Sequence, residues 1–155
     1  MRVHLGSDHA GFELKELLAT RLSEIGHEVV DHGPKAFDPQ DDYPPFCLRA
    51  AEAVVGDQGS LGVVIGGSGN GELIAANKVR GVRAALAWNK NTALLARGHN
   101  DANVVAVGAR LHVPDEVVAL VEAFLAEPFS QEARHSRRIA MLTEYEQHGT
   151  LPPLP

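Results

Sequence analysis

The sequence predicts an open, doubly wound α/β sandwich built on a five-stranded parallel sheet. Three observations support this fold class. Short apolar segments rich in β-branched residues alternate along the chain with segments of helical periodicity. The first strand, helix and strand fit within about 30 residues, as in the βαβ unit of a parallel sheet. Four glycines within residues 66–71 lie between an apolar strand and a helical segment, where such sheets bind ligands.

The beginning of the chain is typical of one βαβ unit. We expect a strand at residues 3–7, a helix over 12–25 and a second strand at 28–31. The apolar residues of the middle segment recur mainly at spacings of three and four, which places them on one face of a helix. Gly26 directly follows this segment and predicts its end.

The next stretch contains the segment on which the predicted chemistry depends. A proline- and aspartate-rich loop at residues 32–45 leads into a predicted helix at 46–55. The run at 61–65 predicts a buried strand, because it is short, apolar and β-branched. A glycine-rich loop follows at 66–72, and residues 73–77 suit the first turn of a helix.

The remainder of the chain repeats the alternation of strand and helix. The predicted elements are a strand at 83–87, a helix at 92–97, a strand at 103–108 and a helix at 113–126 that Pro114 opens. Ser130 predicts the cap of a last helix that runs to about residue 148. We expect one domain over residues 1–150. The prolines in residues 151–155 cannot continue a helix and predict a disordered tail.

Composition narrows the class of protein. A chain of 155 residues suits one domain with a substantial core. The net charge of -6, from 14 basic and 20 acidic residues, argues against a nucleic-acid surface. The one cysteine, Cys47, excludes an internal disulfide and predicts a buried structural thiol in a reducing compartment. No secretory signal and no apolar run of about 18 residues is present. We therefore expect a cytoplasmic protein that binds neither nucleic acid nor a membrane.

The glycine-rich loop predicts a site for an anion or a developing oxyanion. Its glycines let the backbone approach a ligand closely, and the helix that follows offers unpaired N–H groups. Two nucleotide-binding motifs fail on spacing. The third glycine of a dinucleotide motif would have to stand where the chain has Glu72, and so would the lysine of a P-loop.

Glu72 favours a different chemistry. A carboxylate would repel a polyphosphate, but it suits a general base beside a small carbonyl substrate. The helix dipole favours the carboxylate and burial favours the neutral acid, and we expect burial to raise the pKa of Glu72 once substrate fills the site. The alternative is a structural turn whose glutamate is solvated.

Other polar residues follow the predicted strands at their carboxyl ends. If the first and third strands are neighbours, the loops after them converge. Those loops contain Asp8, His9, Ser68, Asn70 and Glu72.

On the last predicted helix, Arg134 and Arg138 share one face and suit a clamp on a phosphate. The alternatives are a solvated basic helix face and histidines that are only structural. No zinc-type spacing of His, Cys and Asp is present, so we expect no metal site.

These motifs together resemble the type B ribose-5-phosphate isomerases and the related galactose-6-phosphate isomerase subunits. The resemblance covers nearly the whole chain, with six motifs in the family's order. They occupy residues 6–11, 42–44, 66–72, 75–78, 99–103 and 134–138. Many members have a cysteine as catalytic base at the position of Gly66. This chain is similar instead to the subgroup in which a glutamate later in the loop, here Glu72, is the base.

The resemblance implies a Rossmann-like three-layer fold, no metal or other cofactor, and a homodimer or tetramer with active sites at the subunit interface. It implies an aldose–ketose isomerase that interconverts ribose 5-phosphate and ribulose 5-phosphate in the non-oxidative pentose phosphate pathway. Asp8 and His99 would open the sugar ring, with His99 reaching in from the partner subunit. Glu72 would move a proton between C2 and C1 through a cis-enediolate.

The expected binding groups complete this site. The oxyanion would be held by the Ser68 hydroxyl and by backbone N–H groups in the run Gly67, Ser68, Gly69, Asn70 and Gly71. The phosphate would be held by Arg134 and Arg138, assisted by His9 and Arg110. The sugar hydroxyls would be contacted, or the pocket shaped, by Asn100 and Tyr43.

Two alternatives stay open. The same chemistry could act on a four-carbon or a six-carbon sugar phosphate, because an extra carbon changes only a few contacts. The chain could also be a sugar-phosphate-binding module without catalysis. Such a module would need the arginines but not the acid–base groups Glu72, Asp8 and His99, so their presence favours the enzyme.

Overall fold

Five parallel strands form the central sheet of the computed structural model, which describes residues 1–154. The strands are β1 (Arg2–Ser7), β2 (Glu28–Asp31), β3 (Leu61–Gly66), β4 (Ala84–Leu86) and β5 (Val104–Gly108). Their order is β2-β1-β3-β5-β4, and each neighbouring pair is parallel. The predicted five-stranded parallel sheet is confirmed.

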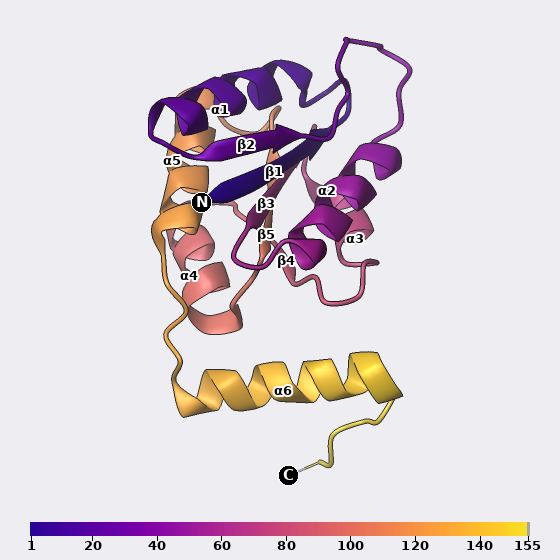
Figure 1. Cartoon of the computed structure of the whole chain (residues 1–155), viewed down its shortest axis with the longest axis vertical. Helices are drawn as coiled ribbons and strands as arrows, with labels where there is room; N and C mark the ends of the chain where they lie inside the picture. Colours follow the sequence, from indigo (N-terminus) through magenta and orange to yellow (C-terminus); the bar gives the residue numbers. More distant parts are fainter. Residues whose placement is uncertain (155) are drawn as a thin grey trace.

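Helices cover both faces of the sheet and make the predicted three layers (Figure 1). One face carries α1 (Phe12–Glu24), α4 (Lys90–Asn100) and α5 (Pro114–Ala126). The other carries α2 (Pro44–Gly56) and α3 (Asn70–Ala76). Because both faces are covered, the two central strands β3 and β5 are buried along their whole length.

The carboxyl ends of β1 and β3 lie side by side, with Ser7 opposite Ile65 in the register. From β1 the chain continues into α1 on one face, and from β3 it continues into α3 on the other. This is the switch point at which open α/β sheets bind their ligands. The convergence expected for the loops after these two strands is confirmed.

Three helices begin earlier than predicted. α3 begins at Asn70 instead of residue 73, so Glu72 belongs to the first turn of this helix and not to the loop. α2 begins at Pro44 instead of residue 46, because prolines in the first turn need no hydrogen-bond partner. α4 covers residues 90–100 instead of 92–97, since Asn89 and Thr92 cap each other's backbone at its start. The polar cluster 97–101 therefore belongs to the end of a helix and its C-cap.

The last helix, α6 (Ala133–His148), lies outside the three layers and packs within this chain against α4 (Figure 1). The prediction that Ser130 caps it is wrong. Glu132 occupies the N-cap without a side-chain cap, and the Ser130 hydroxyl instead bonds His135 Nδ1 at 2.8 Å.

Residues 151–154 have no regular secondary structure. Pro155 lies outside the described residues, and disorder of the tail stays a prediction. Among residues 1–154, no helix has the length and apolarity to cross a membrane.

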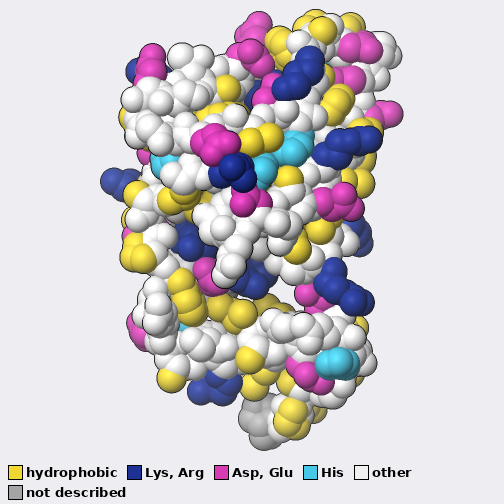
Figure 2. Space-filling model, viewed as in Figure 1, with side chains coloured by type: hydrophobic (Ala, Val, Ile, Leu, Met, Phe, Trp, Pro, Cys, Tyr) yellow, Lys and Arg dark blue, Asp and Glu magenta, His cyan; other side chains and the backbone are white. Residues whose placement is uncertain are grey.

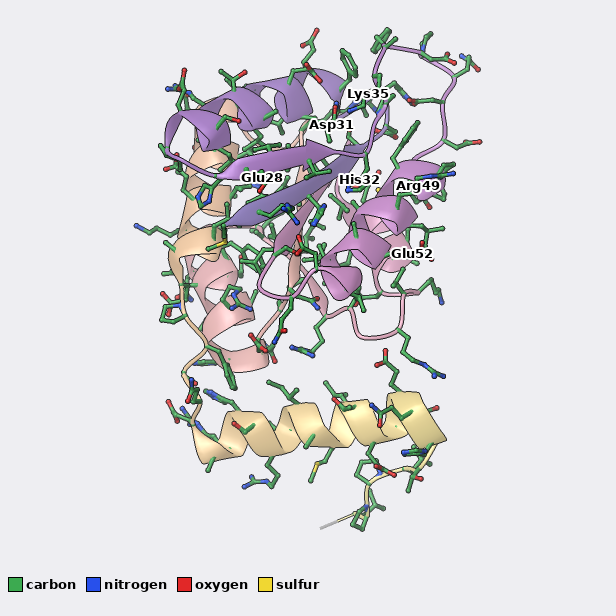
Figure 3. The ribbon with its side chains drawn as sticks, viewed as in Figure 1. Glu28, Asp31, His32, Lys35, Arg49 and Glu52 are labelled. Atoms are coloured by element: carbon green, nitrogen blue, oxygen red, sulfur yellow. The ribbon has the colours of Figure 1, made fainter. Side chains whose placement is uncertain are left out.

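A buried lysine ties α1 to β2. Lys15 is fully buried, and its Nζ donates to Asp31 Oδ2 at 2.6 Å and to Glu16 Oε1 at 2.8 Å. Asp31 Oδ1 accepts from the Gly33 backbone, and Lys35 adds a second ion pair from the surface (Figure 3). Burial alone would raise the pKa of Asp31, but the hydrogen bonds from Lys15 and Gly33 lower it. The ion pair between Lys15 and Asp31 fixes the start of the loop that crosses the carboxyl edge of the sheet.

We predict that Asp31→Ala lowers the free energy of unfolding by about 3 kcal/mol, because it leaves a buried ammonium without its main partner. The loss is at the lower end for buried pairs, since Glu16 still reaches Lys15. Urea unfolding at one fixed protein concentration measures it. Asp42→Ala is the control, since Asp42 is exposed and should change stability by less than about 0.5 kcal/mol. Equal effects of the two substitutions would contradict this role of Asp31.

Candidate active site

The carboxyl group of Glu72 occupies the space that a side chain on Gly66 would need. A Cβ built on Gly66 would collide with both carboxyl oxygens of Glu72. Gly66 is the last residue of β3, and Glu72 stands in the first turn of α3 with only 4% of its surface exposed. The missing side chain at Gly66 is therefore what admits the carboxyl group to the carboxyl edge of the sheet.

The surroundings of Glu72 favour its neutral form. Burial raises the pKa of Glu72, and the negative charge of Asp8 raises it further. A hydrogen bond from the backbone of Glu72 acts in the opposite direction and does not overcome them. The shift moves the carboxyl group toward the neutral range, where general acid–base catalysis is most efficient. The further rise expected when substrate fills the site stays a prediction.

The glycine-rich loop is held against the end of β5 by its own backbone. The carbonyls of Gly66 and Gly67 accept from the N–H groups of Ala109 at 2.8 Å and Arg110 at 3.0 Å. A Cβ on Gly108 would lie 2.9 Å from the backbone of Ser68, so these two backbone segments pack directly against each other with no side chain between them. The loop is thereby fixed close to the sheet.

Three predicted site residues surround this loop. Asp8 is buried at the end of β1, and its Oδ1 accepts from the backbone N–H of Ala10 at 2.9 Å and of Gly11 at 3.3 Å. The Tyr43 ring lies against Gly71, and the Arg110 side chain lies against Gly67.

His9 is held by a residue that sequence analysis missed. Asp41 Oδ1 lies 2.9 Å from His9 Nδ1 and also accepts from the His9 backbone N–H at 2.8 Å. The hydrogen bond to Asp41 raises the pKa of His9, and the charge of Asp8 adds to this effect. Asp41 and His9 stand 32 positions apart in the sequence, so no local motif joins them.

Cys47 is not a base in this site. It is fully buried on α2, as predicted, and burial raises the pKa of its thiol, with further contributions from the charges of Glu72 and Asp8. A thiol in such surroundings stays protonated and unreactive. Among residues 1–154, no group of three His, Cys, Asp or Glu side chains is arranged to hold a metal ion.

The predicted site side chains at this edge of the sheet, together with Asp41, form one group, which we call the carboxyl-edge cluster. They lie in the loops after β1, β2, β3 and β5, at the N-cap of α2 and in the first turn of α3. The members are Asp8, His9, Asp41, Tyr43, Ser68, Asn70, Glu72 and Arg110.

The other predicted site residues lie elsewhere, and we call them the amino-edge cluster. His99 and Asn100 are exposed at the end of α4, and Arg134 and Arg138 are exposed on α6. The His99 ring lies over the ring of buried His135, with centroids 4.1 Å apart. Arg134 pairs with Glu132 at 2.8 Å.

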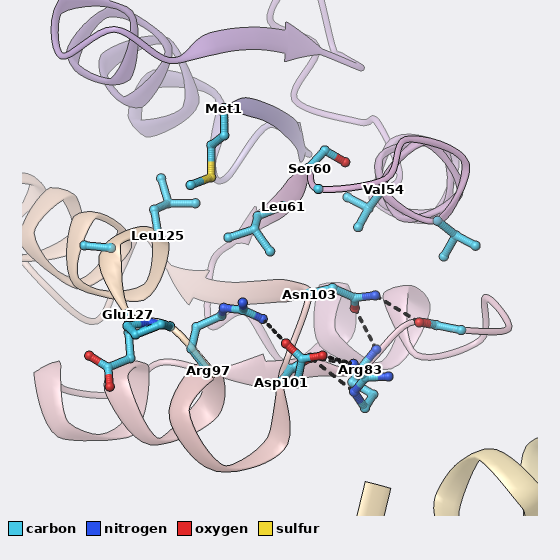
Figure 4. A pocket seen from close by; sticks show the side chains of 15 residues that line it. Met1, Val54, Ser60, Leu61, Arg83, Arg97, Asp101, Asn103, Leu125 and Glu127 are labelled. Carbon is cyan, nitrogen blue, oxygen red and sulfur yellow. Dashed lines mark hydrogen bonds and ion pairs between the residues drawn. The ribbon is translucent and has the colours of Figure 1, made fainter. Parts of the chain in front are cut away.

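A clamp of two arginines on one aspartate fixes the end of α4 (Figure 4). Asp101 pairs with Arg97 at 2.7 Å and with Arg83 at 2.9 Å. Arg83 Nε also donates to the Asn100 carbonyl at 2.9 Å. The clamp borders a cavity of about 580 Å³ that contains no predicted site residue. The clamp of Asp101 with Arg97 and Arg83 fixes the turn that follows His99 and Asn100.

Within one chain, His99 and Asn100 lie at the opposite edge of the sheet from the carboxyl-edge cluster. α4 starts beyond the carboxyl end of β4 and ends near the amino end of β5, where Asn103 accepts a bond from Gly62 and donates one to Arg83. Eleven helical residues span about 16 Å. The structure of one chain therefore brings Asp8, His9, Tyr43 and Glu72 together but leaves His99 and Asn100 apart from them.

Sequence analysis missed two residues that support the site. Asp101 lies in a recognisable motif, whereas no motif points to Asp41. Asp101 stands inside the motif at residues 99–103, although that motif gave it no role. Its left-handed backbone, with φ of 45°, ends α4 and turns its side chain toward both arginines.

Comparison with known proteins gives consistent matches along the chain. The family model described as Ribose/Galactose Isomerase matches residues 3–142. The ribose-5-phosphate isomerase B of Mycobacterium tuberculosis (strain ATCC 25618 / H37Rv) is 54% identical over 155 residues, which are 100% of this chain and 96% of that protein.

Solved structures with the same fold include two ribose-5-phosphate isomerases B. The Clostridium thermocellum protein superposes with a TM-score of 0.91 at 40% identity, covering 97% of this chain and 100% of that one. The Mycoplasma genitalium protein with bound ribulose 5-phosphate also gives 0.91, at 39% identity, covering 95% of this chain and 97% of that one.

We predict that Gly66→Ala displaces the Glu72 carboxyl group without unfolding the protein, because the atoms in the way belong to the end of a flexible side chain. Expulsion into water should lower the pKa of Glu72 toward its ordinary range. Carbon-13 NMR titration of the glutamate carboxyls measures it.

Gly56→Ala is the matched control, since nothing lies within 4 Å of a Cβ at that position. It should leave the pKa of Glu72 unchanged. A Glu72 pKa that stays raised in Gly66→Ala would contradict the role given to Gly66.

Proposed function

The chain belongs to the ribose/galactose isomerase family, and we propose that it interconverts ribose 5-phosphate and ribulose 5-phosphate as an aldose–ketose isomerase. The observation that carries this function is the buried carboxyl group of Glu72, which lies in the space left by Gly66 with its pKa raised. A module that only bound sugar phosphates would gain nothing from burying a carboxylate, which costs free energy. The family includes proteins whose names specify ribose 5-phosphate at high identity over the full chain.

Each proton transfer has a candidate group. Asp8 and His99 move protons at the ring oxygen and the anomeric hydroxyl, which opens the furanose. The Glu72 carboxylate takes the proton from C2 of the aldose, and the C1 carbonyl oxygen becomes the enediolate oxygen. The proton of the C2 hydroxyl passes to that oxygen as C2 becomes the carbonyl, and the same carboxyl group of Glu72 returns its proton to C1. The product is the ketose, and the carboxylate is regenerated.

The negative charges of the enediolate and of the phosphate also have candidate binding groups. The enediolate oxygen is held by the Ser68 hydroxyl and by backbone N–H groups of the glycine-rich loop, whose fixed position spares reorganisation during the reaction. The phosphate is held by guanidinium and imidazolium groups. Those groups belong to His9, Arg110, Arg134 and Arg138.

We further propose a homodimer in which each site combines two chains. The carboxyl-edge cluster of one subunit would receive the amino-edge cluster of its partner, and twofold symmetry would form two equal sites. Support comes from the separation of the two clusters in one chain and from the position of α6. Leu142 and Tyr145 on α6 are 61% and 52% exposed, and Figure 2 shows a hollow between this helix and the body of the chain.

Assignment to the non-oxidative pentose phosphate pathway follows from the two sugar phosphates. A cytoplasmic location stays a prediction.

We predict that Glu72→Gln lowers kcat for ribose 5-phosphate by about 10²–10⁴-fold with little change in KM, because the amide keeps the shape of the base and cannot take a proton. In the wild type, kcat/KM should fall as the pH drops through the raised pKa of Glu72, since only the carboxylate is a base. That acidic limb should lie above the ordinary range of a glutamate.

Glu24→Gln is the control, because Glu24 is exposed at the end of α1. An active Glu72→Gln enzyme would place the base elsewhere. A wild type that is inactive on ribose 5-phosphate but stabilised by a four-carbon or six-carbon sugar phosphate would change the substrate and keep the site.

We predict that Glu72→Gln and His99→Asn, each nearly inactive alone, regain activity when they are mixed. In a mixed dimer, one site receives both defects and the other receives wild-type Glu72 with wild-type His99. Random pairing of equal amounts restores about one quarter of wild-type activity. Unfolding and refolding the chains together, followed by assay, measures it. Mixtures that remain inactive would contradict the shared site.

A further inference from the structure

We propose that Asp41 is a positioning residue for substrate binding, holding the His9 imidazole in the orientation and charge state that bind the phosphate group. The inference rests on the proposed function, which assigns His9 to the phosphate. Asp41 itself needs no contact with the substrate. It acts through His9 from the loop between β2 and α2.

The contacts between the two residues fix both the backbone and the ring of His9. One oxygen of Asp41 accepts from the His9 backbone N–H at 2.8 Å and lies 2.9 Å from Nδ1. The Asp41 side chain is 10% exposed, whereas the His9 side chain is 30% exposed. The carboxylate therefore supports the ring from the protein side and leaves part of the ring open to a ligand.

This geometry determines which nitrogen is left for the phosphate. Because a carboxylate only accepts hydrogen bonds, Nδ1 must carry the proton that points to Asp41. The other nitrogen, Nε2, then holds a proton only when the ring is cationic. Phosphate oxygens are acceptors as well, so a direct bond requires the cation.

The charges around His9 favour that cation. The hydrogen bond to Asp41 stabilises it most, burial opposes it, and the charge of Asp8 at the end of β1 adds a smaller favourable effect. Arg110 is the cation of the carboxyl-edge cluster, and both its side chain and Ala10, the residue after His9, lie against Gly67. The second oxygen of Asp41, Oδ2, is buried and accepts no hydrogen bond from the described part of the chain. The charge of this carboxylate is thus directed at His9.

The test is Asp41→Asn, which keeps the shape and an accepting oxygen but removes the charge. The His9 imidazole is titrated by NMR, with His9→Asn to assign its signal. The dissociation constant of inorganic phosphate is measured calorimetrically between pH 6 and 9. Neither readout needs turnover, so failure of the proposed isomerase activity would be recognised separately by assay with ribose 5-phosphate.

We expect His9 to titrate at lower pH in Asp41→Asn than in the wild type. The two affinities should be closest at the acid end of this pH range, where most of the His9 rings are charged in both proteins, and phosphate should bind roughly 3- to 10-fold more weakly to the variant at pH values between the two His9 titrations. The ionisation of phosphate itself is common to both proteins, so the ratio of the two constants reports on the protein. In a His9→Asn background, Asp41→Asn should no longer weaken phosphate binding.

Asp38→Asn is the matched control, because Asp38 is exposed in the same loop and its side chain accepts only from the backbone of Gln40. It should leave the titration of His9 and the phosphate affinity unchanged. An unshifted His9 titration in Asp41→Asn would overturn the proposal. A weakening of phosphate binding that is equal at every pH would also overturn it. Should Asp41→Asn fail to fold, a wild-type His9 that titrates at or below its ordinary pKa overturns it on its own.

Discussion

The close packing of the glycine-rich loop on the end of β5 is the constraint on which the site depends. Its carbonyls are bound by the loop after β5, and Gly108 leaves room for the backbone of Ser68. The space beside Gly66 lies within reach of the Glu72 side chain only because the loop is held this close to the sheet. The same packing excludes water from the carboxyl group, so that one backbone arrangement both places the base and raises its pKa.

Each of the two clusters is held by an acidic residue that does no chemistry in the proposed mechanism. Asp41 supports His9 at the carboxyl edge, and Asp101 joins two arginines that support the turn after His99. Both carboxylates accept several hydrogen bonds, which makes them effective at fixing neighbouring groups. Catalytic side chains need such support, because small displacements weaken catalysis strongly.

Sequence reasoning recovered the sheet, its parallel strands and the convergence of the first and third loops, because hydrophobic periodicity reports burial directly. It underestimated the lengths of α2 and α4 and placed a cap at Ser130, since capping depends on which side chain the fold brings near each helix end. Asp8 and Glu72 were predicted from their places at strand ends. Asp41 was not, because its pairing with His9 joins distant segments. The distance between His99 and Glu72 likewise depends on the direction of α4, which only the three-dimensional arrangement gives.

The space shared by Gly66 and Glu72 also limits how this site can change over evolutionary time. The resembling enzymes that use a cysteine have it at position 66, where any side chain would collide with the carboxyl group of Glu72. A lineage that exchanged one base for the other one substitution at a time would pass through a form in which neither group is well placed. Such intermediates should lose activity, so we expect the two subgroups to persist as separate lineages with few transitions between them.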